Sequence, residues 1–342
     1  VIDPWKPRQI ASVAHTYDRP RAAVEAMGGA GWSFTLDSAR YGFNMLAAYG
    51  VDFFIPHLFH YAQNNPTNVG DWPNSWFFRN PYWKYFKTLA DHSSRLSYLL
   101  SGSEPVVDVA ILYPQSDVWA GNGGGSTSRL LKSLVSQRVD ADLIDPDSLA
   151  RATVQDGRLC VAKMRYRVLI VPGVRCIRRD ALAKIVAFAR SGRVLVADRW
   201  PEASAEAGQG DAAVRRGVSA LQHAKVKLTP AKELTGLLLG SLALDFTAGK
   251  GDALRYRHAR KEGQDIYWIA NSRRQAGTWT ARFRATGAPA LWNPEDGSIR
   301  PVDEFARDGQ FTSLKLSLDP WQGVFVVFDP SDERAPKPAP VA

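Results

Sequence analysis

One glutamate lies inside an apolar segment near the start of the chain, where its side chain could act as an acid or a base. The segment runs Ala22-Ala-Val-Glu-Ala-Met27, and the proline and glycines that flank it predict a buried strand ending just after Glu25. Burying a carboxylate is costly unless it is paired or takes part in a reaction. Barrels built from βα repeats carry their active groups at the carboxyl ends of the strands. Glu25 is therefore a candidate catalytic residue, and the alternative is a glutamate that only forms a salt bridge at a strand end.

Two histidines accompany the next apolar segment. Residues 51–59 predict a second strand, with His57 near its end and His60 three residues further on. A lone histidine at a strand end is usually structural. Two histidines beside a glutamate on the neighbouring strand end favour a polar pocket, so His57 and His60 are candidate substrate-binding residues.

Three tryptophans, Trp32, Trp72 and Trp76, follow these two predicted strands, with several asparagines among them. Aromatic faces stack on the apolar faces of sugar rings, and side-chain amides hydrogen-bond to hydroxyl groups, so this mixture suits a carbohydrate ligand. The alternative is that the rings only pack their loop onto the rest of the domain. The sequence favours neither reading, and the three tryptophans are candidate sugar-binding residues.

The elements that would hold these residues alternate between strand and helix. Helices are predicted over 34–49 and 82–100, the first ending at Gly50 and the second at Gly102. Residues 1–104 thus give strand, helix, strand, loop and helix, which is the element order of a parallel sheet.

A break in composition at residues 101–105 opens a second series of strands and helices. This series predicts a small doubly wound α/β domain over 105–250. Apolar and polar residues then alternate, which predicts an antiparallel β-sandwich over 251–330. The proline-rich end of the chain, 331–342, is predicted to be a disordered tail.

The composition of the chain excludes several classes of protein. Its 342 residues are 45% hydrophobic and 23% charged, which rules out a disordered chain. No segment approaches the ~20 consecutive apolar residues of a membrane-spanning helix, so we expect no membrane partner. The formal net charge is +9, but the lysines and arginines are spread along the chain without a basic run, so we expect no nucleic-acid partner. The two cysteines, Cys160 and Cys176, can form one bridge at most.

Motifs of other enzyme classes are missing from the sequence. It contains no GxSxG, no HExxH and no zinc-like spacing of cysteine and histidine. The glycine-rich stretch 121–125 departs from the spacing of a dinucleotide-binding loop and is interpreted as a flexible loop. The chain starts at Val1 without an initiator methionine, so either a leader was removed or this is the C-terminal part of a longer protein.

Three separated groups of segments resemble one known family in their order and spacing. The first group surrounds Glu25 and His57, the second joins two predicted domains, and the third lies in the predicted sandwich. They are residues 12–17, 22–27, 31–32 and 50–57, then 95–102 and 108–114, and finally 254–260, 265–271 and 291–297. Together they resemble the C-terminal part of the alpha-L-rhamnosidases of glycoside hydrolase family 106. The family 42 beta-galactosidases, which share the order of barrel and doubly wound domain, are the nearest alternative.

The resemblance implies an α/β multidomain fold. This is the C-terminal part of a (β/α)8 barrel, then a doubly wound domain of amidotransferase or flavodoxin type, then a β-sandwich. It also implies an inverting hydrolase of rhamnose-containing glycans or glycosides that uses two carboxyl groups, often with calcium near the site; the metal ligands remain unassigned. Glu25 matches the glutamate at the end of the family's seventh barrel strand, where the general base is expected.

Only the last two barrel strands precede residue 101, so the strand that by analogy carries the general acid is absent. We therefore expect the chain alone to be inactive. The resemblance implies that the parent protein is a glycosidase. The sequence does not say where that protein resides, and a periplasmic or secreted location is expected before a cytoplasmic one. Two alternatives stay open. One is a non-catalytic accessory or carbohydrate-binding module, and the other is a beta-galactosidase-like hydrolase.

Overall fold

The chain forms two compact units in the computed structural model, which describes residues 2–60, 73–249, 251, 253–332 and 334–336. The first and last predicted domains fall in one unit, and their predicted limits stay a prediction. Unit 1 comprises Val1–Asp3, Pro20–Glu104 and Phe246–Ala342, and unit 2 comprises Pro4–Arg19 and Pro105–Asp245. The predicted tail at 331–342 lies largely outside the described residues.

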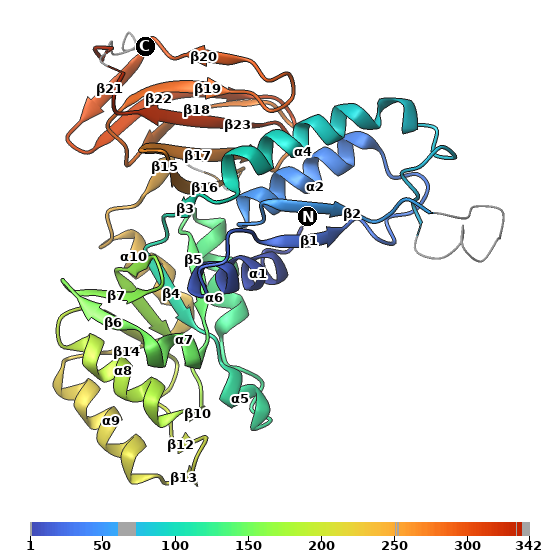
Figure 1. Cartoon of the computed structure of the whole chain (residues 1–342). Helices are drawn as coiled ribbons and strands as arrows, with labels where there is room; N and C mark the ends of the chain where they lie inside the picture. The colour runs from blue at the N-terminus through green and yellow to red at the C-terminus, as the bar shows by residue number, and fades with distance from the viewer. Residues whose placement is uncertain (1, 61–72, 250, 252, 333, 337–342) are drawn as a thin grey trace. The chain divides into compact units, whose positions relative to one another are not determined.

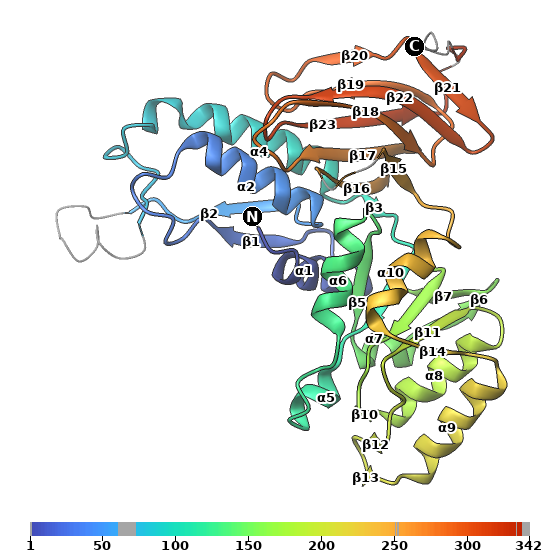
Figure 2. The ribbon, with the colours of Figure 1, turned by 180° about the vertical axis from the view of Figure 1, so that it is seen from behind.

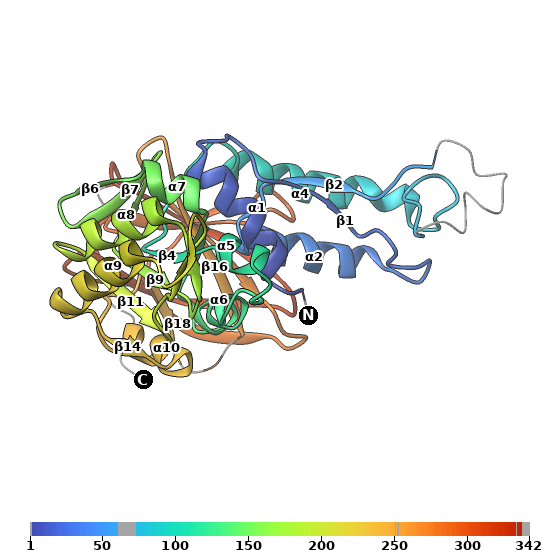
Figure 3. The same ribbon diagram turned by 90° about the horizontal axis from the view of Figure 1, so that it is seen from below.

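The N-terminal part of unit 1 alternates strands and helices, as the sequence predicts. Two short strands pair in parallel, and two long helices lie beside them (Figure 3). The ring of Phe43 in the first helix packs on Phe54 in the second strand, with centroids 5.0 Å apart. The elements are β1 (Ala23–Ala26), α2 (Leu36–Ala48), β2 (Phe53–Pro56), the 3-10 turn η1 (Trp83–Tyr85) and α4 (Phe86–Leu100).

Two antiparallel sheets form the C-terminal part of unit 1 (Figure 1). Leu314, Leu316 and Leu318 point into the core between the sheets, as their alternation predicts. The four-stranded sheet has the order β15-β18-β22-β21, and the six-stranded sheet has the order β20-β19-β23-β17-β16-β3. The strands are β3 (Glu104–Pro105), β15 (Phe246–Ala248), β16 (Leu254–Lys261), β17 (Gln264–Asn271), β18 (Gly277–Phe283), β19 (Ala288–Trp292), β20 (Ile299–Pro301), β21 (Phe305–Asp308), β22 (Phe311–Leu318) and β23 (Gly323–Asp329).

Hydrogen bonds fasten α2 and α4 to these sheets. The indole Nε1 of Trp268, on β17, donates to the backbone carbonyl of Asn44 in α2 at 3.0 Å. Arg95 of α4 donates to the backbone carbonyl of Glu295 at 3.1 Å, and Arg40 of α2 forms an ion pair with the Glu295 side chain. The turn after β19 thus fixes both helices, and through them the strands that carry Glu25 and His57.

Unit 2 is built on a parallel sheet of five strands with helices on both faces (Figure 2). The order is β14-β11-β9-β4-β5, which in chain order reads 2-1-3-4-5 from the other edge, the order of flavodoxin-like doubly wound sheets. The strands are β4 (Val109–Leu112), β5 (Ala141–Ile144), β9 (Val168–Val171), β11 (Arg193–Ala197) and β14 (Leu228–Thr229). The helices between these strands are α5 (Gln115–Trp119), α6 (Thr127–Ser136), α7 (Pro146–Arg151), α8 (Arg179–Ala189) and α9 (Ala212–His223), and α10 (Ala231–Leu239) follows β14.

Two small sheets and one unpredicted helix complete unit 2. The sheets are β6 (Thr153–Gln155), β7 (Arg158–Val161) and β8 (Met164–Tyr166), and β10 (Cys176–Ile177), β12 (Ala203–Ser204) and β13 (Gly208–Gln209). Helix α1 (Trp5–Thr16) packs on β5, and the sequence pattern did not predict this helix. Its buried face carries the polar residues Arg8, Ser12 and His15, so the hydrophobic period that marks a helix is missing.

Two expectations from composition can be compared with this fold. Both cysteines are free, Cys160 partly exposed and Cys176 buried, so the single bridge that they could have formed is not made. None of the helices in the described part of the chain is both long and apolar enough to cross a membrane.

Candidate active site

Glu25 lies at the carboxyl end of β1, and His57 is the first residue after β2. The backbone N–H of His57 donates to the carbonyl of Ala26 at 2.8 Å, which extends the pairing of the two strands by one residue. The two side chains therefore meet at the same sheet edge, where Nε2 of His57 is 3.9 Å from Oε1 of Glu25. The structure thus brings together two of the residues that the sequence singles out, without a close hydrogen bond between them.

The Glu25 side chain is 67% exposed, whereas that of His57 is only 17% exposed. Glu25 lies opposite Ile55 on the open face of the two-stranded sheet, together with Phe53. The prediction that Glu25 belongs to a buried strand is therefore wrong, because alternation along β1 turns its side chain to solvent. Its carboxylate is available to bind water or a substrate hydroxyl, which a buried and paired group is not.

His57 is held by its main chain and by close packing of its ring. The indole Nε1 of Trp76 donates to the carbonyl of His57 at 2.9 Å, and the Trp76 backbone N–H donates to the carbonyl of Leu58 at 2.9 Å. A Cβ added at Gly28 would lie 3.3 Å from Cγ of His57, so the ring packs tightly on the chain that leaves β1. Its buried Nδ1 has no hydrogen-bond partner within the described residues.

The other candidate sugar-binding residues have different surroundings. Trp76 is 1% exposed and packs against Phe34 and Phe86, so it positions His57 and presents no ring face for stacking, contrary to the role expected for it. His60 is also buried, whereas Trp32 is 38% exposed in the loop after β1. Trp72 falls within 61–72, which lies outside the described residues.

The side-chain amide of Asn74, two residues before Trp76 along the chain, is buried without a hydrogen-bond partner in the described residues. Asn74 has no exposed surface, and neither its Oδ1 nor its Nδ2 has a partner among the residues that the structure describes. The carbonyl of the preceding Pro73 accepts the backbone N–H of Gly31 at 2.9 Å, which joins this segment to the loop after β1. Nothing in the sequence pattern distinguishes this asparagine from the others of the region, so its burial could not be predicted.

A buried ion pair fixes the beginnings of β1 and β2. Asp52 accepts the backbone N–H of Ala22 at 2.9 Å and a hydrogen bond from Arg257, on β16, at 3.2 Å. Arg257 also donates to the carbonyl of Gly50 at 3.1 Å. Both side chains of the pair are almost fully buried. This network fixes where the two strands begin relative to each other, and with that the position of Glu25 and His57 at their ends.

A second carboxylate–histidine pair lies in unit 2 and has the opposite character. Both oxygens of the buried Asp142 lie close to Nδ1 of His15, at 2.9 and 3.0 Å, and the hydroxyl of Tyr166 donates to Oδ2 at 2.9 Å. The hydroxyl of Ser12 lies 3.3 Å from Oδ1. We call Asp142, His15, Tyr166 and Ser12 the buried polar cluster. It attaches α1 to the sheet, and no local pattern in the sequence reveals it because Ser12 and His15 lie more than a hundred residues from Asp142.

A family model described as alpha-L-rhamnosidase, glycoside hydrolase family 106, matches residues 5–307. The chain belongs to this family. A curated protein of Formosa agariphila named "Putative beta-glucuronidase" is 27% identical over 338 residues, which are 94% of this chain and 28% of that protein.

Solved structures support the fold of this rhamnosidase-family chain. A rhamnosidase from Novosphingobium sp. PP1Y is 22% identical, with a TM-score of 0.75 over 97% of this chain and 33% of its own. A catalytic mutant of a family 42 beta-galactosidase from G. stearothermophilus is 11% identical, with a TM-score of 0.57 over 86% of this chain and 51% of its own. The mixed α/β fold is thus shared with both groups of enzymes. The chain spans about a third of the length of the rhamnosidase.

The calcium ion implied by the family resemblance has no obvious set of ligands in the described residues. None of the histidine, cysteine, aspartate and glutamate side chains there gather in a group of three or more that could hold a metal. Calcium prefers six to eight oxygen ligands, several of them carboxylates. The described part of this rhamnosidase-family chain thus offers no such cluster, and the calcium site stays a prediction.

Proposed function

We propose that this chain forms one side of the active site of an inverting glycoside hydrolase that cleaves alpha-L-rhamnosidic bonds, with Glu25 as general base. The Glu25 carboxylate takes a proton from a water molecule while the water oxygen attacks the anomeric carbon. The bond from that carbon to the leaving oxygen breaks as a general acid protonates the leaving oxygen. The exposed position of Glu25 at the carboxyl end of β1, in a chain of the rhamnosidase family, carries this proposal.

The general acid is proposed to lie on a segment outside the given sequence. An inverting pair of carboxyl groups stands about 6.5–9.5 Å apart, which leaves room for the attacking water. In this proposal β1, α2, β2 and α4 are the last two βα units of a (β/α)8 barrel. The open face that carries Glu25, Phe53 and Ile55 supports this, because inward residues of a complete barrel are normally covered by side chains from other strands.

His57 and Trp32 are proposed to complete the sugar-binding side of this site. Nε2 of His57 lies near the Glu25 carboxylate, where it can hydrogen-bond to a sugar hydroxyl or to the attacking water. Trp32 offers a partly exposed ring after β1, which can stack on a sugar face. In this proposal the buried Trp76 acts indirectly, by fixing the main chain of His57, and the buried His60 does not contact the sugar.

A second candidate substrate comes from the curated relative. Its name assigns that protein to the beta-glucuronidases, so an aryl glucuronide belongs in the substrate panel beside an aryl rhamnoside and an aryl galactoside. Preferred cleavage of the rhamnoside supports the proposal. Preferred cleavage of the glucuronide or galactoside would reassign the substrate while leaving the role of Glu25 intact. No turnover of any of the three by the parent protein would favour a non-catalytic carbohydrate-binding role.

The role of Glu25 is tested by Glu25→Gln in the parent protein. Loss of a general base is expected to lower kcat by about 10²–10⁴-fold, with KM changed much less because the amide has almost the same size. Glu262→Gln is the matched control, since Glu262 is also an exposed glutamate of unit 1 and lies in the turn between β16 and β17. NMR of the first product should show inversion at the anomeric carbon. Activity of Glu25→Gln equal to that of the control would assign Glu25 to structure.

A further inference from the structure

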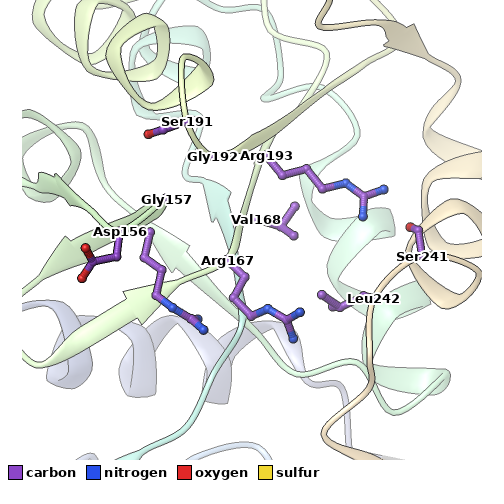
Figure 4. Close-up of a pocket in the computed structure, with 10 residues that line it drawn as sticks. Asp156, Gly157, Arg167, Val168, Ser191, Gly192, Arg193, Ser241 and Leu242 are labelled. Carbon is purple, nitrogen blue, oxygen red and sulfur yellow. The ribbon is translucent and has the colours of Figure 1, made fainter.

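A cavity of about 480 Å³ lies in unit 2, at the edge of the parallel sheet where the strands begin. Doubly wound domains usually bind ligands at the opposite edge, beyond the carboxyl ends of the strands. Three arginines line this cavity, and each stands at the start of a strand: Arg158 at β7, Arg167 just before β9 and Arg193 at β11. Figure 4 shows the side chains of Arg167 and Arg193 both extending toward Ser241 and Leu242.

The positive charge of this cavity is only partly balanced. Arg167 has a carboxylate partner, Asp108 at 3.4 Å, and donates to the carbonyl of Ala243 at 3.3 Å. Neither Arg158 nor Arg193 forms an ion pair with any residue in the described part of the chain. Burial, and then the neighbouring charge of Arg167, lower the pKa of Arg193.

The one acidic side chain in the lining does not neutralise these groups. Asp156 pairs with Arg165 at 3.5 Å, and in Figure 4 its carboxylate points away from Arg167 and Arg193. Arg193 thus stands beside the like charge of Arg167 without a carboxylate partner of its own, and an anion bound between the two groups would offset their repulsion.

The walls of the cavity are fixed by close backbone contacts. Gly157 has a positive φ of 68°, and a Cβ at this position would lie 2.9 Å from the backbone oxygen of Ser191. The turn between β6 and β7 is thus packed directly onto the turn between α8 and β11. Arg158 and Arg193 flank these two turns, so their spacing is set by the main chain. Such a rigid arrangement suits the recognition of an oxyanion by forked guanidinium groups.

We propose that this cavity binds a tetrahedral oxyanion carried by a molecule of about the size of a monosaccharide, as a sulfate or phosphate ester. Guanidinium groups bind such oxyanions through paired hydrogen bonds, and the hydroxyls of Ser191 and Ser241 lie in the same lining. The volume falls in the range of about 300–1,000 Å³ that holds small organic ligands and exceeds what a lone ion needs. The lining contains no aromatic ring, so the ionic group carries the recognition.

Isothermal titration calorimetry of the 342-residue chain at low salt tests this site with glucose 6-sulfate, glucose 6-phosphate and neutral glucose. Saturable binding of either ester, with no binding of glucose, supports the proposal. Preference for the sulfate indicates a sulfated saccharide, and preference for the phosphate indicates a phosphorylated metabolite. Raising the salt concentration should weaken binding, since the contact is ionic.

Variants separate a specific site from general attraction to a basic protein. Arg158→Gln and Arg193→Gln should each weaken ester binding at least about tenfold, the loss of one charge-assisted contact. Arg216→Gln, which removes an exposed arginine of α9 outside the cavity, should change it less than twofold. Circular dichroism and thermal unfolding check that all variants fold. Absence of saturable binding, or equal weakening by Arg216→Gln, would overturn the proposal and leave the arginines as structural groups at the starts of their strands.

Discussion

The two carboxylate–histidine pairs of this chain differ in how completely their hydrogen-bonding capacity is used. Glu25 faces His57 across 3.9 Å at an open strand end, and its side chain is largely exposed. Asp142 is completely buried, and His15, Tyr166 and Ser12 surround its two oxygens. A carboxylate beside an imidazole therefore serves two different purposes in this chain. The buried group is committed to its neighbours, whereas the exposed group can accept a proton from another molecule.

The electrostatics of the buried polar cluster explain this commitment. Burial alone would raise the pKa of Asp142, but the charge and hydrogen bond of His15, the nearby Arg8 and the hydroxyl of Tyr166 together hold it below its usual value. The same burial and the Asp142 charge raise the pKa of Tyr166 well above its usual value. Asp142 therefore stays ionised and Tyr166 stays protonated near neutral pH, which fixes the direction of the hydrogen bond between them.

The largest expected difference between the two pairs is in stability. Asp142→Ala should lower the free energy of unfolding by about 3–5 kcal/mol, because its buried partners lose their acceptor. Glu25→Ala should change it by no more than about 0.5 kcal/mol, since Glu25 is exposed and loosely held. Urea denaturation of the 342-residue chain at pH 7 measures both. Equal losses in the two variants would remove the distinction between a committed and an available carboxylate.

A buried histidine without a carboxylate sharpens the comparison. His92 of α4 lies 2.7 Å from the amide oxygen of Asn44, and no carboxylate contributes to its pKa. Burial first, and then the charges of Arg40 and Arg95, lower the pKa of His92 to about 3. In the unfolded chain a histidine titrates near pH 6.5. As the pH falls from 6.5 toward 3, the unfolded chain therefore binds a proton that the folded chain does not, and stability decreases.

This acid-side loss should depend on His92 itself. Between the two pKa values, His92 lowers the free energy of unfolding by up to about 1.4 kcal/mol for each pH unit of acidification. Above pH 6.5 it has no such effect. His92→Gln keeps a donor for Asn44 and should flatten the pH dependence by that amount, measured by urea denaturation at intervals between pH 7 and 4. His223→Gln is the control, because His223 is exposed on α9. An unchanged slope in His92→Gln would show that another group titrates.

The sequence predicted those elements whose apolar pattern agrees with their packing. The buried strands β4 and β9, helix α2 and the alternating strand β22 all follow the pattern of their apolar residues. Helix α1 was missed because its buried face is held by polar groups, whose contacts with Asp142 lie more than a hundred residues away along the chain. Local periodicity carries no information about such a long-range network.

For the candidate site, the sequence predicted location better than environment. The rule that polar groups gather at the carboxyl ends of parallel strands placed Glu25 beside His57. The exposure of Glu25 and the burial of Trp76 were not foreseen, because each depends on which side of a short strand or loop faces the helices. The sequence also could not predict that Asp52 and Arg257 fix both strands, since these two residues are 205 positions apart.

The variant with the smallest expected effect tests how His57 of the exposed Glu25–His57 pair is held in position. Trp76→Phe keeps an aromatic ring in the buried position but removes the N–H that reaches the carbonyl of His57, so it should cost about 1–2 kcal/mol. Trp83→Phe is the matched control, because Trp83 belongs to the neighbouring aromatic cluster and is 37% exposed. The two variants should also differ locally. Faster amide hydrogen exchange at His57 and Leu58 in Trp76→Phe alone would show that the main chain positions this histidine, whereas unchanged exchange would assign that task to ring packing on Gly28.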